Sequence, residues 1–209
     1  MESAFLSAIS FERQDSSMAR DARGSIIDAS WELFKEKGFE KTTIDDIIAK
    51  AGIAKGTFYH HFQGKSALLG TLSDVFDEQY REMDAELDPE GSVVEQIEYL
   101  NRRMFGWIEK HVPVELLSAQ LASQLNERGD RSLVNQDRFY FAIHRKLVAR
   151  GQDRGEITRD YSTHDIVRLY AMAERSMLYD WCLHQGAQPL VGEPTRIVAE
   201  VLSRFVRRI

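Results

Sequence analysis

Lysine, glycine, tyrosine and histidine residues lie close together between Thr42 and Leu69, in a pattern suited to binding a polyanion. The segment reads TTIDDIIAKAGIAKGTFYHHFQGKSALL. Lys55 can reach a guanine edge or a phosphate, and Gly56 lets a helix backbone approach a groove closely because it has no side chain. Tyr59 can contact a phosphate or a thymine methyl group. These residue types and their spacing indicate a helix that enters a DNA major groove.

Two short helices and a tight turn are needed to position these side chains. Thr43 and Asp46 form a weaker version of the capping box that starts a helix, and Gly52 fits the left-handed position that ends one. The apolar residues between them share one helix face: Ile44, Ile47, Ile48 and Ala51. The sequence therefore predicts a helix-turn-helix unit.

The second helix, expected over residues 55–61, has a clear inward and outward side. Phe58 and Phe62 lie about one turn apart and are expected to pack against the preceding helix. The opposite side carries Gly56, Tyr59, His60 and Gln63, with Thr57 at its flank.

These motifs resemble the tetracycline-repressor (TetR) family of bacterial transcription regulators. The resemblance is carried by TTIDDIIAKAGI, then KGTFYHHF, then KSALL, and it runs from the first helix to the start of the fourth. It implies base contacts by Lys55 and Gly56 and mostly phosphate contacts by the others. The implied DNA-binding residues are Thr42, Thr43, Lys55, Gly56, Thr57, Tyr59, His60, His61 and Lys65. Ala54 departs from the family, because a serine or threonine is frequent there and would cap the helix.

Each of these residues also has a purely structural interpretation. Thr43 would cap its helix whether or not it touches phosphate, Tyr59 would serve as a packed aromatic, and Lys65 would be a solvated surface residue. Adjacent residues point about 100° apart on a helix, so His60 and His61 are poorly placed to chelate a metal, and no metal site is expected.

Composition and charge are compatible with a soluble cytoplasmic DNA-binding protein. The 209 residues are 43% hydrophobic and carry a net charge of −6, but residues 18–70 hold eight Lys/Arg and seven Asp/Glu. The acidic balance therefore lies outside the candidate DNA-binding segment. Neither a membrane-spanning run nor a secretory signal is expected. Cys182 is the only cysteine, which excludes an internal disulfide and suits a reducing cytoplasm.

Helical periodicity continues along the chain, and no strand alternation or internal repeat interrupts it. The expected helices cover about 18–37, 43–51, 55–61, 65–87, 92–111, 113–128, 131–151, 163–185 and 193–208. The predicted fold is all-α, with about nine helices. Residues 1–17 are expected to be a flexible tail and 18–64 a three-helix DNA-binding head. Residues 65–209 are expected to form a larger helical effector-binding and dimerisation body.

The resemblance implies that the last two long helices form a four-helix interface in a homodimer. The interface residues expected there are Ile166, Tyr170, Ala173, Met177, Trp181, Ile197, Val201, Leu202 and Phe205. Ordinary core packing must account for part of this apolar surface. A two-fold dimer would place its recognition helices in successive major grooves and would require a near-palindromic operator.

A pocket in the body is expected to bind a small apolar or aromatic effector. The candidate residues are Met104, Trp107, His111, Tyr140, Phe141, His144, Met172 and Arg175. Aromatic residues and methionines at helical spacing are also typical of an ordinary core, and this alternative stays open. No cofactor is expected.

The leading hypothesis is a homodimeric repressor that a small-molecule effector releases from its operator. An activator of similar design, or a helical interaction module without ligand control, is the alternative. An enzyme is not expected, because no metalloprotease, P-loop, nucleophile-elbow or paired-cysteine motif is present.

Overall fold

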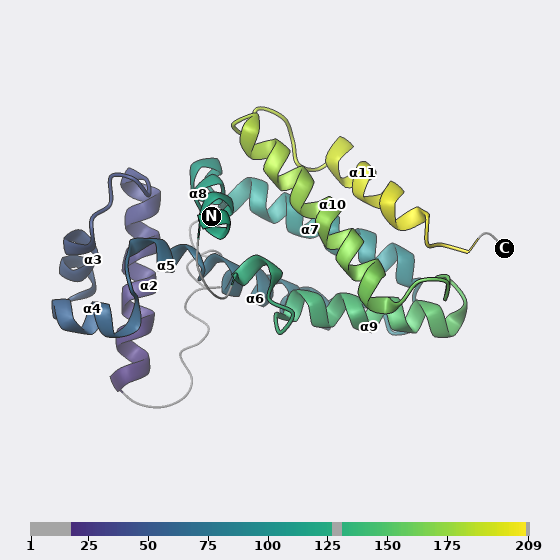
Figure 1. Cartoon of the computed structure of the whole chain (residues 1–209), viewed down its shortest axis with the longest axis horizontal. Helices are drawn as coiled ribbons and strands as arrows, with labels where there is room; N and C mark the ends of the chain where they lie inside the picture. The colour runs from purple at the N-terminus through teal and green to yellow at the C-terminus, as the bar shows by residue number, and fades with distance from the viewer. Residues whose placement is uncertain (1–17, 127–130, 208–209) are drawn as a thin grey trace. The chain divides into compact units, whose positions relative to one another are not determined.

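The computed structural model describes residues 18–126 and 131–207, and these are almost entirely helical (Figure 1). The expected tail, residues 1–17, lies outside the described residues. The helices are α2 (Met18–Lys37), α3 (Ile44–Ala51), α4 (Lys55–His61), α5 (Lys65–Leu69), α6 (Leu72–Glu86), α7 (Val93–His111), α8 (Val114–Asn126), the 3-10 turn η2 (Ser132–Val134), α9 (Phe139–Arg154), α10 (Thr163–Leu183) and α11 (Glu193–Ser203). Within these ranges the only β-type pairing is an isolated bridge between Ile157 and Val206. The all-α fold is therefore confirmed, and each of the nine expected segments contains a helix.

The helix expected over residues 65–87 is divided into α5 and α6. The break comes at Thr71, whose hydroxyl donates to the Leu68 carbonyl at 2.6 Å and accepts from the Trp31 indole at 3.0 Å. A threonine side chain that captures a carbonyl of the preceding turn competes with the helical backbone bonds. Trp31 is fully buried, so this break is fixed by the packing of α2.

The helix expected over residues 131–151 begins later and ends later than predicted. α9 starts at Phe139 because Asp77 of α6 accepts hydrogen bonds from the backbone N–H groups of Phe139 and Tyr140, at 3.1 and 3.3 Å. The same carboxylate forms a buried ion pair with Arg138 at 2.7 Å. Asp77 therefore acts as a helix cap supplied by another helix. Gly151 does not end α9; a Cβ there would come within 2.8 Å of Ile157, so this glycine permits close packing.

The last helix is also shorter than the expected range of 193–208. α11 ends at Ser203 because the following residues pair with the loop before α10. The Thr158 N–H donates to the Phe205 carbonyl at 2.8 Å, and the Arg207 N–H donates to the Glu156 carbonyl at 2.9 Å.

The described chain divides into two compact units. Unit 1 comprises the chain up to Val75 together with Glu115–Leu133, and unit 2 comprises Phe76–Val114 together with the chain from Val134 onward. Helix α6 therefore contributes residues to both. In unit 1, α2 packs against α3 and α4, and the buried core residues include Trp31, Phe34, Ile47, Phe58 and Leu68.

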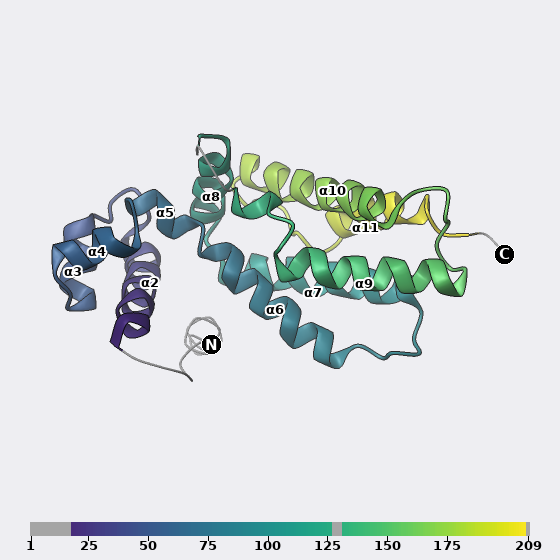
Figure 2. The same ribbon diagram turned by 60° about the horizontal axis from the view of Figure 1, so that its bottom comes forward.

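Unit 2 is a bundle in which α10 packs against both α9 and α11, and α7 also packs against α9 and α11 (Figure 2). Its core includes Leu100, Met104, Phe105, Ile108, Val148, Val167 and Leu202. Among the described helices, none has both the length and the apolar character needed to cross a membrane.

Candidate functional site

The turn between α2 and α3 fixes the start of the helix-turn-helix unit. Thr43 is the N-cap of α3: its hydroxyl accepts from the Asp46 N–H at 3.1 Å, and its own N–H donates to the Asp46 carboxylate at 2.8 Å. The predicted capping box is confirmed. Lys37 donates to the same carboxylate at 2.6 Å and, together with the bonds from Thr43, holds the pKa of Asp46 well below its usual range. At the other end of α3, Gly52 has φ +67° and ends the helix in the left-handed conformation.

The two sides of α4 are oriented as the sequence predicts. Phe58 is fully buried and Phe62 is nearly so, whereas Tyr59 is 49% exposed. The outward side is formed by Lys55, Gly56, Tyr59 and His60, with Thr57 and His61 half-buried at its flanks. A Cβ built at Gly56 would meet no atom within 4 Å, so the backbone is open to close approach from outside. Ala54 provides no side-chain cap for α4, and the predicted weak point at the start of this helix is present.

Lys55 has an acidic partner that its sequence neighbourhood does not predict. The Asp45 carboxylate accepts from the Lys55 ammonium at 3.1 Å, and this bond raises the pKa of Lys55. Both side chains are exposed, at 63% for Lys55 and 78% for Asp45, so the pair is screened by water. Lys55 can therefore exchange Asp45 for a phosphate or a base at little energetic cost.

Two of the expected DNA contacts have structural roles instead. Thr42 is 1% exposed, and its hydroxyl donates to the Gly38 carbonyl at 2.8 Å, so its side chain is not available to DNA. Lys65 directs its ammonium to the carbonyls of Phe39, Glu40 and Thr42, at 2.7, 3.2 and 3.0 Å. An ammonium has three N–H donors, so a phosphate contact would require Lys65 to give up one of these bonds. Lys65 instead fixes the loop that leads to Thr43.

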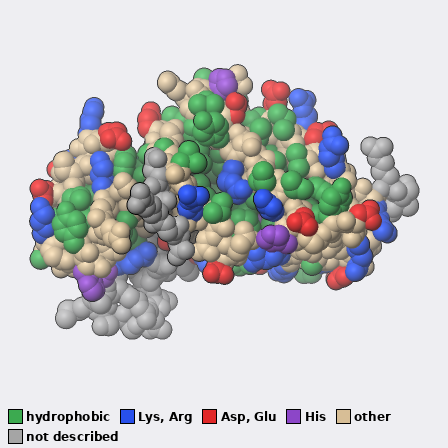
Figure 3. Space-filling model, viewed as in Figure 1, with side chains coloured by type: hydrophobic (Ala, Val, Ile, Leu, Met, Phe, Trp, Pro, Cys, Tyr) green, Lys and Arg blue, Asp and Glu red, His purple; other side chains and the backbone are tan. Residues whose placement is uncertain are grey.

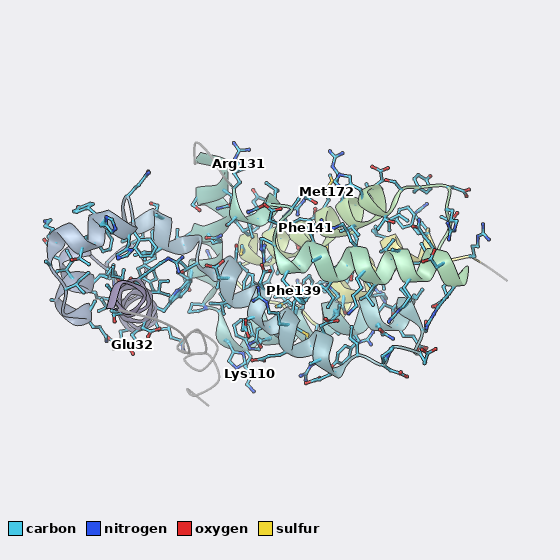
Figure 4. The ribbon with its side chains drawn as sticks, turned by 90° about the horizontal axis from the view of Figure 1, so that it is seen from below. Glu32, Lys110, Arg131, Phe139, Phe141 and Met172 are labelled. Atoms are coloured by element: carbon cyan, nitrogen blue, oxygen red, sulfur yellow. The ribbon has the colours of Figure 1, made fainter. Side chains whose placement is uncertain are left out.

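The expected effector residues do not form one cluster. Tyr140 and His144 stack on α9 with ring centroids 4.4 Å apart, and Phe141 meets Tyr140 edge-on at 4.8 Å. Trp107 and His111 form a separate stacked pair on α7, at 4.9 Å. Met104 is buried in the core, and Arg175 is half-buried. Figure 4 labels Phe141 on α9 and Met172 on α10; Met172 is 46% exposed, so it does not belong to the buried core of unit 2.

The structure instead assembles a buried polar cluster around Glu174 of α10. Glu174 is 5% exposed, and its carboxylate accepts from the Asn101 amide at 2.7 Å and from the Tyr140 hydroxyl at 2.6 Å. The Tyr170 hydroxyl donates to the Ile97 carbonyl at 3.4 Å. Burial and the Glu174 charge raise the pKa of Tyr140 and Tyr170 well above the usual range, so both hydroxyls remain protonated donors.

His144 adds to this cluster a ring nitrogen, Nε2, that can accept a hydrogen bond but receives none. Its Nδ1 lies 2.7 Å from the Tyr140 carbonyl, which can only accept, so Nδ1 carries the proton in the neutral ring. Its Nε2 is buried and has no hydrogen-bond partner. Burial lowers the pKa of His144, although the Glu174 charge opposes that shift, so the ring is held neutral.

The sequence prediction did not include Glu174 and Asn101 among the candidate binding residues. Both lie at positions that continue an apolar helix face. Glu174 follows Val167 and Tyr170 by seven and four positions, and Asn101 follows Ile97 by four. These intervals place both polar residues on the buried faces of their helices. A polar residue within an apolar helical stripe was the available signal.

The nine residues expected at the dimer interface differ in their exposure. Five of them are buried inside unit 2 and are not available to a second copy: Ile166, Tyr170, Trp181, Leu202 and Phe205. Ala173, Met177 and Val201 are half-buried, and Ile197 is exposed. The large apolar residues that α10 leaves exposed are Leu169, Met172, Tyr179 and Leu183. Figure 3 shows hydrophobic side chains on the face where α10 and α11 lie in Figure 1.

Together, the capped α3, the glycine turn and the outward polar side of α4 define a helix-turn-helix DNA-binding protein. Residues 26–72 match the family model described as "Bacterial regulatory proteins, tetR family". The match lies over the helix-turn-helix segment and supports the resemblance to the TetR family that the sequence motifs predict there.

Similar proteins span most of the chain. The HTH-type transcriptional regulator SrpR of Pseudomonas putida is 25% identical over 171 residues, covering 80% of this chain and 78% of SrpR. The HTH-type transcriptional regulator UidR of Escherichia coli K12 is 28% identical over 157 residues, covering 72% and 76% of the two chains. The crystal structure of Thermus thermophilus FadR, a TetR-family transcriptional repressor in complex with lauroyl-CoA, has a TM-score of 0.69 at 21% identity and covers 90% of this chain and 96% of its own. These relatives are regulators, not enzymes.

Within the described residues, no group of three or more His, Cys, Asp or Glu side chains is arranged to hold a metal ion.

Proposed function

We propose that the chain is a homodimeric repressor that a small-molecule effector releases from a near-palindromic operator. The observation that carries the DNA-binding part is the exposed side of α4, where Lys55, Gly56, Tyr59 and His60 point away from the Phe58 core. In this proposal residues 18–64 read DNA, and residues 65–209 bind the effector and dimerise. A regulator of chromosomal DNA would act in the cytoplasm.

The DNA contacts divide into base contacts and phosphate contacts. Lys55 and Gly56, at the start of α4, face the base edges, because helix N-terminal residues enter the groove first. Thr43, Thr57, Tyr59, His60 and His61 contact the backbone on either side. Thr42 and Lys65 hold the loop before α3 in place and do not belong to the contact surface.

The dimer interface is proposed on the exposed apolar face of α10, with Ile197 of α11 beside it. Leu169, Met172, Tyr179 and Leu183 follow one another at intervals of three, seven and four residues, which keeps them on one helical stripe. Single exposed apolar residues are common, but a continuous stripe of large ones indicates a binding surface. A second copy is the natural occupant, since a two-fold dimer places two recognition helices roughly 34 Å apart on DNA.

An effector site in the helical body is supported by the lauroyl-CoA complex of the similarly folded FadR. A ligand would act by binding one conformation of the body more tightly than another. Activation instead of repression depends on where the operator lies relative to the promoter, and it stays the alternative.

The test begins by selecting fragments of the source genome that the protein binds. Operator affinity is then measured by fluorescence anisotropy, and the oligomeric state by light scattering. Tyr59→Ala with His60→Ala should abolish operator binding and leave the dimer intact. Tyr161→Ala is a matched control, since Tyr161 is 50% exposed but lies outside the proposed contact surface. Retained operator binding in the double variant would contradict the assigned reading surface.

The dimer face is tested separately. Leu183→Glu should convert the dimer to a monomer and weaken operator binding. Leu125→Glu should do neither, although Leu125, at 77%, is even more exposed than Leu183, at 62%. An intact dimer in Leu183→Glu would exclude this face.

A further inference from the structure

We propose that the cluster around Glu174 binds a small ligand with a protonated primary or secondary amine. This inference rests on the proposed effector-responsive function, and it specifies the chemical class of ligand that unit 2 recognises.

The first argument is the charge of the cluster. Glu174 is buried, yet the donors that reach it are the neutral Asn101 amide and the neutral Tyr140 hydroxyl. In the described part of the chain, no Lys or Arg forms a salt bridge with Glu174; the nearby Arg138 is paired with Asp77. A buried carboxylate without a cation is costly, and a ligand cation would offset that cost. A carboxylate has about four lone-pair sites, so the bonds from Asn101 and Tyr140 leave it able to accept more.

The second argument is the orphan acceptor on His144. Its Nε2 is buried without a donor, while Nδ1 is engaged by the Tyr140 carbonyl. The cluster therefore offers two kinds of acceptor and needs a group with at least two N–H donors. A protonated primary or secondary amine has them. A quaternary ammonium has none, and a carboxylate would be repelled by Glu174.

The third argument is the aromatic surround. The His144 ring lies 4.4 Å from Tyr140, 5.6 Å from Tyr80 and 5.4 Å from Tyr170, measured between ring centroids. The faces of tyrosine rings attract cations, most strongly in desolvated sites. These rings come from α6, α9 and α10, so three helices of unit 2 contribute aromatic surface around the His144 ring.

A cavity lies beside this cluster. It has a volume of about 260 Å³ and is lined by Asn101, which bonds to Glu174, and by Tyr170, whose ring centroid lies 5.4 Å from that of His144. Its volume is slightly below the usual range of about 300–1,000 Å³ for ligand sites, so it suits a single-ring amine better than a coenzyme A thioester. Glu98, Arg102 and Arg196 also line it; Glu98 and Arg102 pair with each other at 3.4 Å. Arg196 makes an anionic ligand the competing outcome.

The experiment compares compounds that share a phenylethyl group on the full-length protein. Calorimetry at pH 7.5 would measure 2-phenylethylamine, 2-phenylethanol, 3-phenylpropanoate and, separately, lauroyl-CoA. The amine should bind at least about 30-fold more tightly than the alcohol, because only the amine forms the buried charge pair. Glu174→Gln should reduce the amine affinity to that of the alcohol. The exposed Glu200→Gln should leave it unchanged, and circular dichroism would check that both variants fold.

The outcomes separate this inference from the proposed function. Equal affinity for the amine and the alcohol, no binding of the amine, or preference for the carboxylate would overturn the inference, and this ranking on the unaltered protein does not depend on how Glu174→Gln folds. Release of the operator by lauroyl-CoA together with no amine binding would overturn the inference and leave the effector-released repressor standing. Tight amine binding without operator release would support the Glu174 site and refute the effector role.

Discussion

Replacing Gly56 with alanine should make the protein more stable and a poorer DNA binder. A Cβ at this position meets no atom within 4 Å, and its φ is not in the left-handed region, so the folded chain accepts it without strain. Alanine exceeds glycine in helix propensity by up to about 1 kcal/mol, and the gain near a helix start is smaller, roughly 0.5 kcal/mol. On DNA the methyl group would enter the space that the backbone needs. Overpacking of a close contact costs about 1–3 kcal/mol, or roughly five- to 150-fold in operator affinity.

The two effects are measured independently and have opposite signs. Urea unfolding at fixed protein concentration gives the stability, and anisotropy with the selected operator gives the affinity. Gly24→Ala is the control, since its Cβ would also meet no atom within 4 Å and it lies on α2, away from the reading side of α4. It should preserve operator affinity. Unchanged operator binding by Gly56→Ala would refute the close backbone approach on which the DNA-reading proposal depends.

Three further predictions concern stability. Ala54→Ser should supply the missing cap of α4 and raise the free energy of unfolding by about 0.5–2 kcal/mol, as measured by urea unfolding; no gain would mean that this helix end is already satisfied. Asp77→Ala should destabilise the fold by about 3–5 kcal/mol, because it leaves Arg138 buried without its partner, whereas Asp84→Ala, which removes a more exposed ion pair, should cost far less. Equal thermal unfolding of these two variants would contradict the role of Asp77. The pKa of His144 is lowered by burial. As the pH falls below 6.5, His144 therefore takes up a proton in the unfolded chain but stays neutral in the folded chain. The stability contributed by the neutral ring is present above pH 6.5 and is lost as the pH falls toward the folded pKa. His144→Phe should therefore lose less stability than the unaltered protein between pH 7.5 and 5.5, and parallel losses would argue against a buried neutral His144.

Local signals were enough to predict the helix-turn-helix unit. Thr43 and Gly52 mark the ends of α3 by capping chemistry that depends on residues a few positions away. The phase of α4 follows from Phe58 and Phe62 alone. Such features can be read from sequence because their causes lie within one or two helical turns.

Lys65 and Thr42 show where local reasoning stops. Their types suit phosphate binding, but the carbonyls that occupy Lys65 belong to residues 39–42, more than twenty positions earlier. Sequence spacing does not reveal that these carbonyls point at the ammonium. The same holds for Glu174, whose partner Asn101 lies 73 positions away.

The phase of α10 was missed for a different reason. This helix has apolar residues on more than half of its circumference, so periodicity alone does not say which part faces the core. The core takes Ile166, Tyr170 and Trp181, and the positions between them, such as Leu169 and Met172, remain outside. Which side of α10 faces the core is determined by its packing against α9 and α11.

The cap that Asp77 provides for α9 has a consequence for the order of folding. Arg138, at the N-cap position, makes no side-chain cap of its own, so the first N–H groups of α9 are satisfied only after α6 has docked. A peptide containing residues 131–154 alone should therefore fray at its N-terminal turn, and α9 should reach its full length late in folding. Asp77, which caps the start of this helix, lies 61 positions before Arg138, in a segment that leaves the ribosome first.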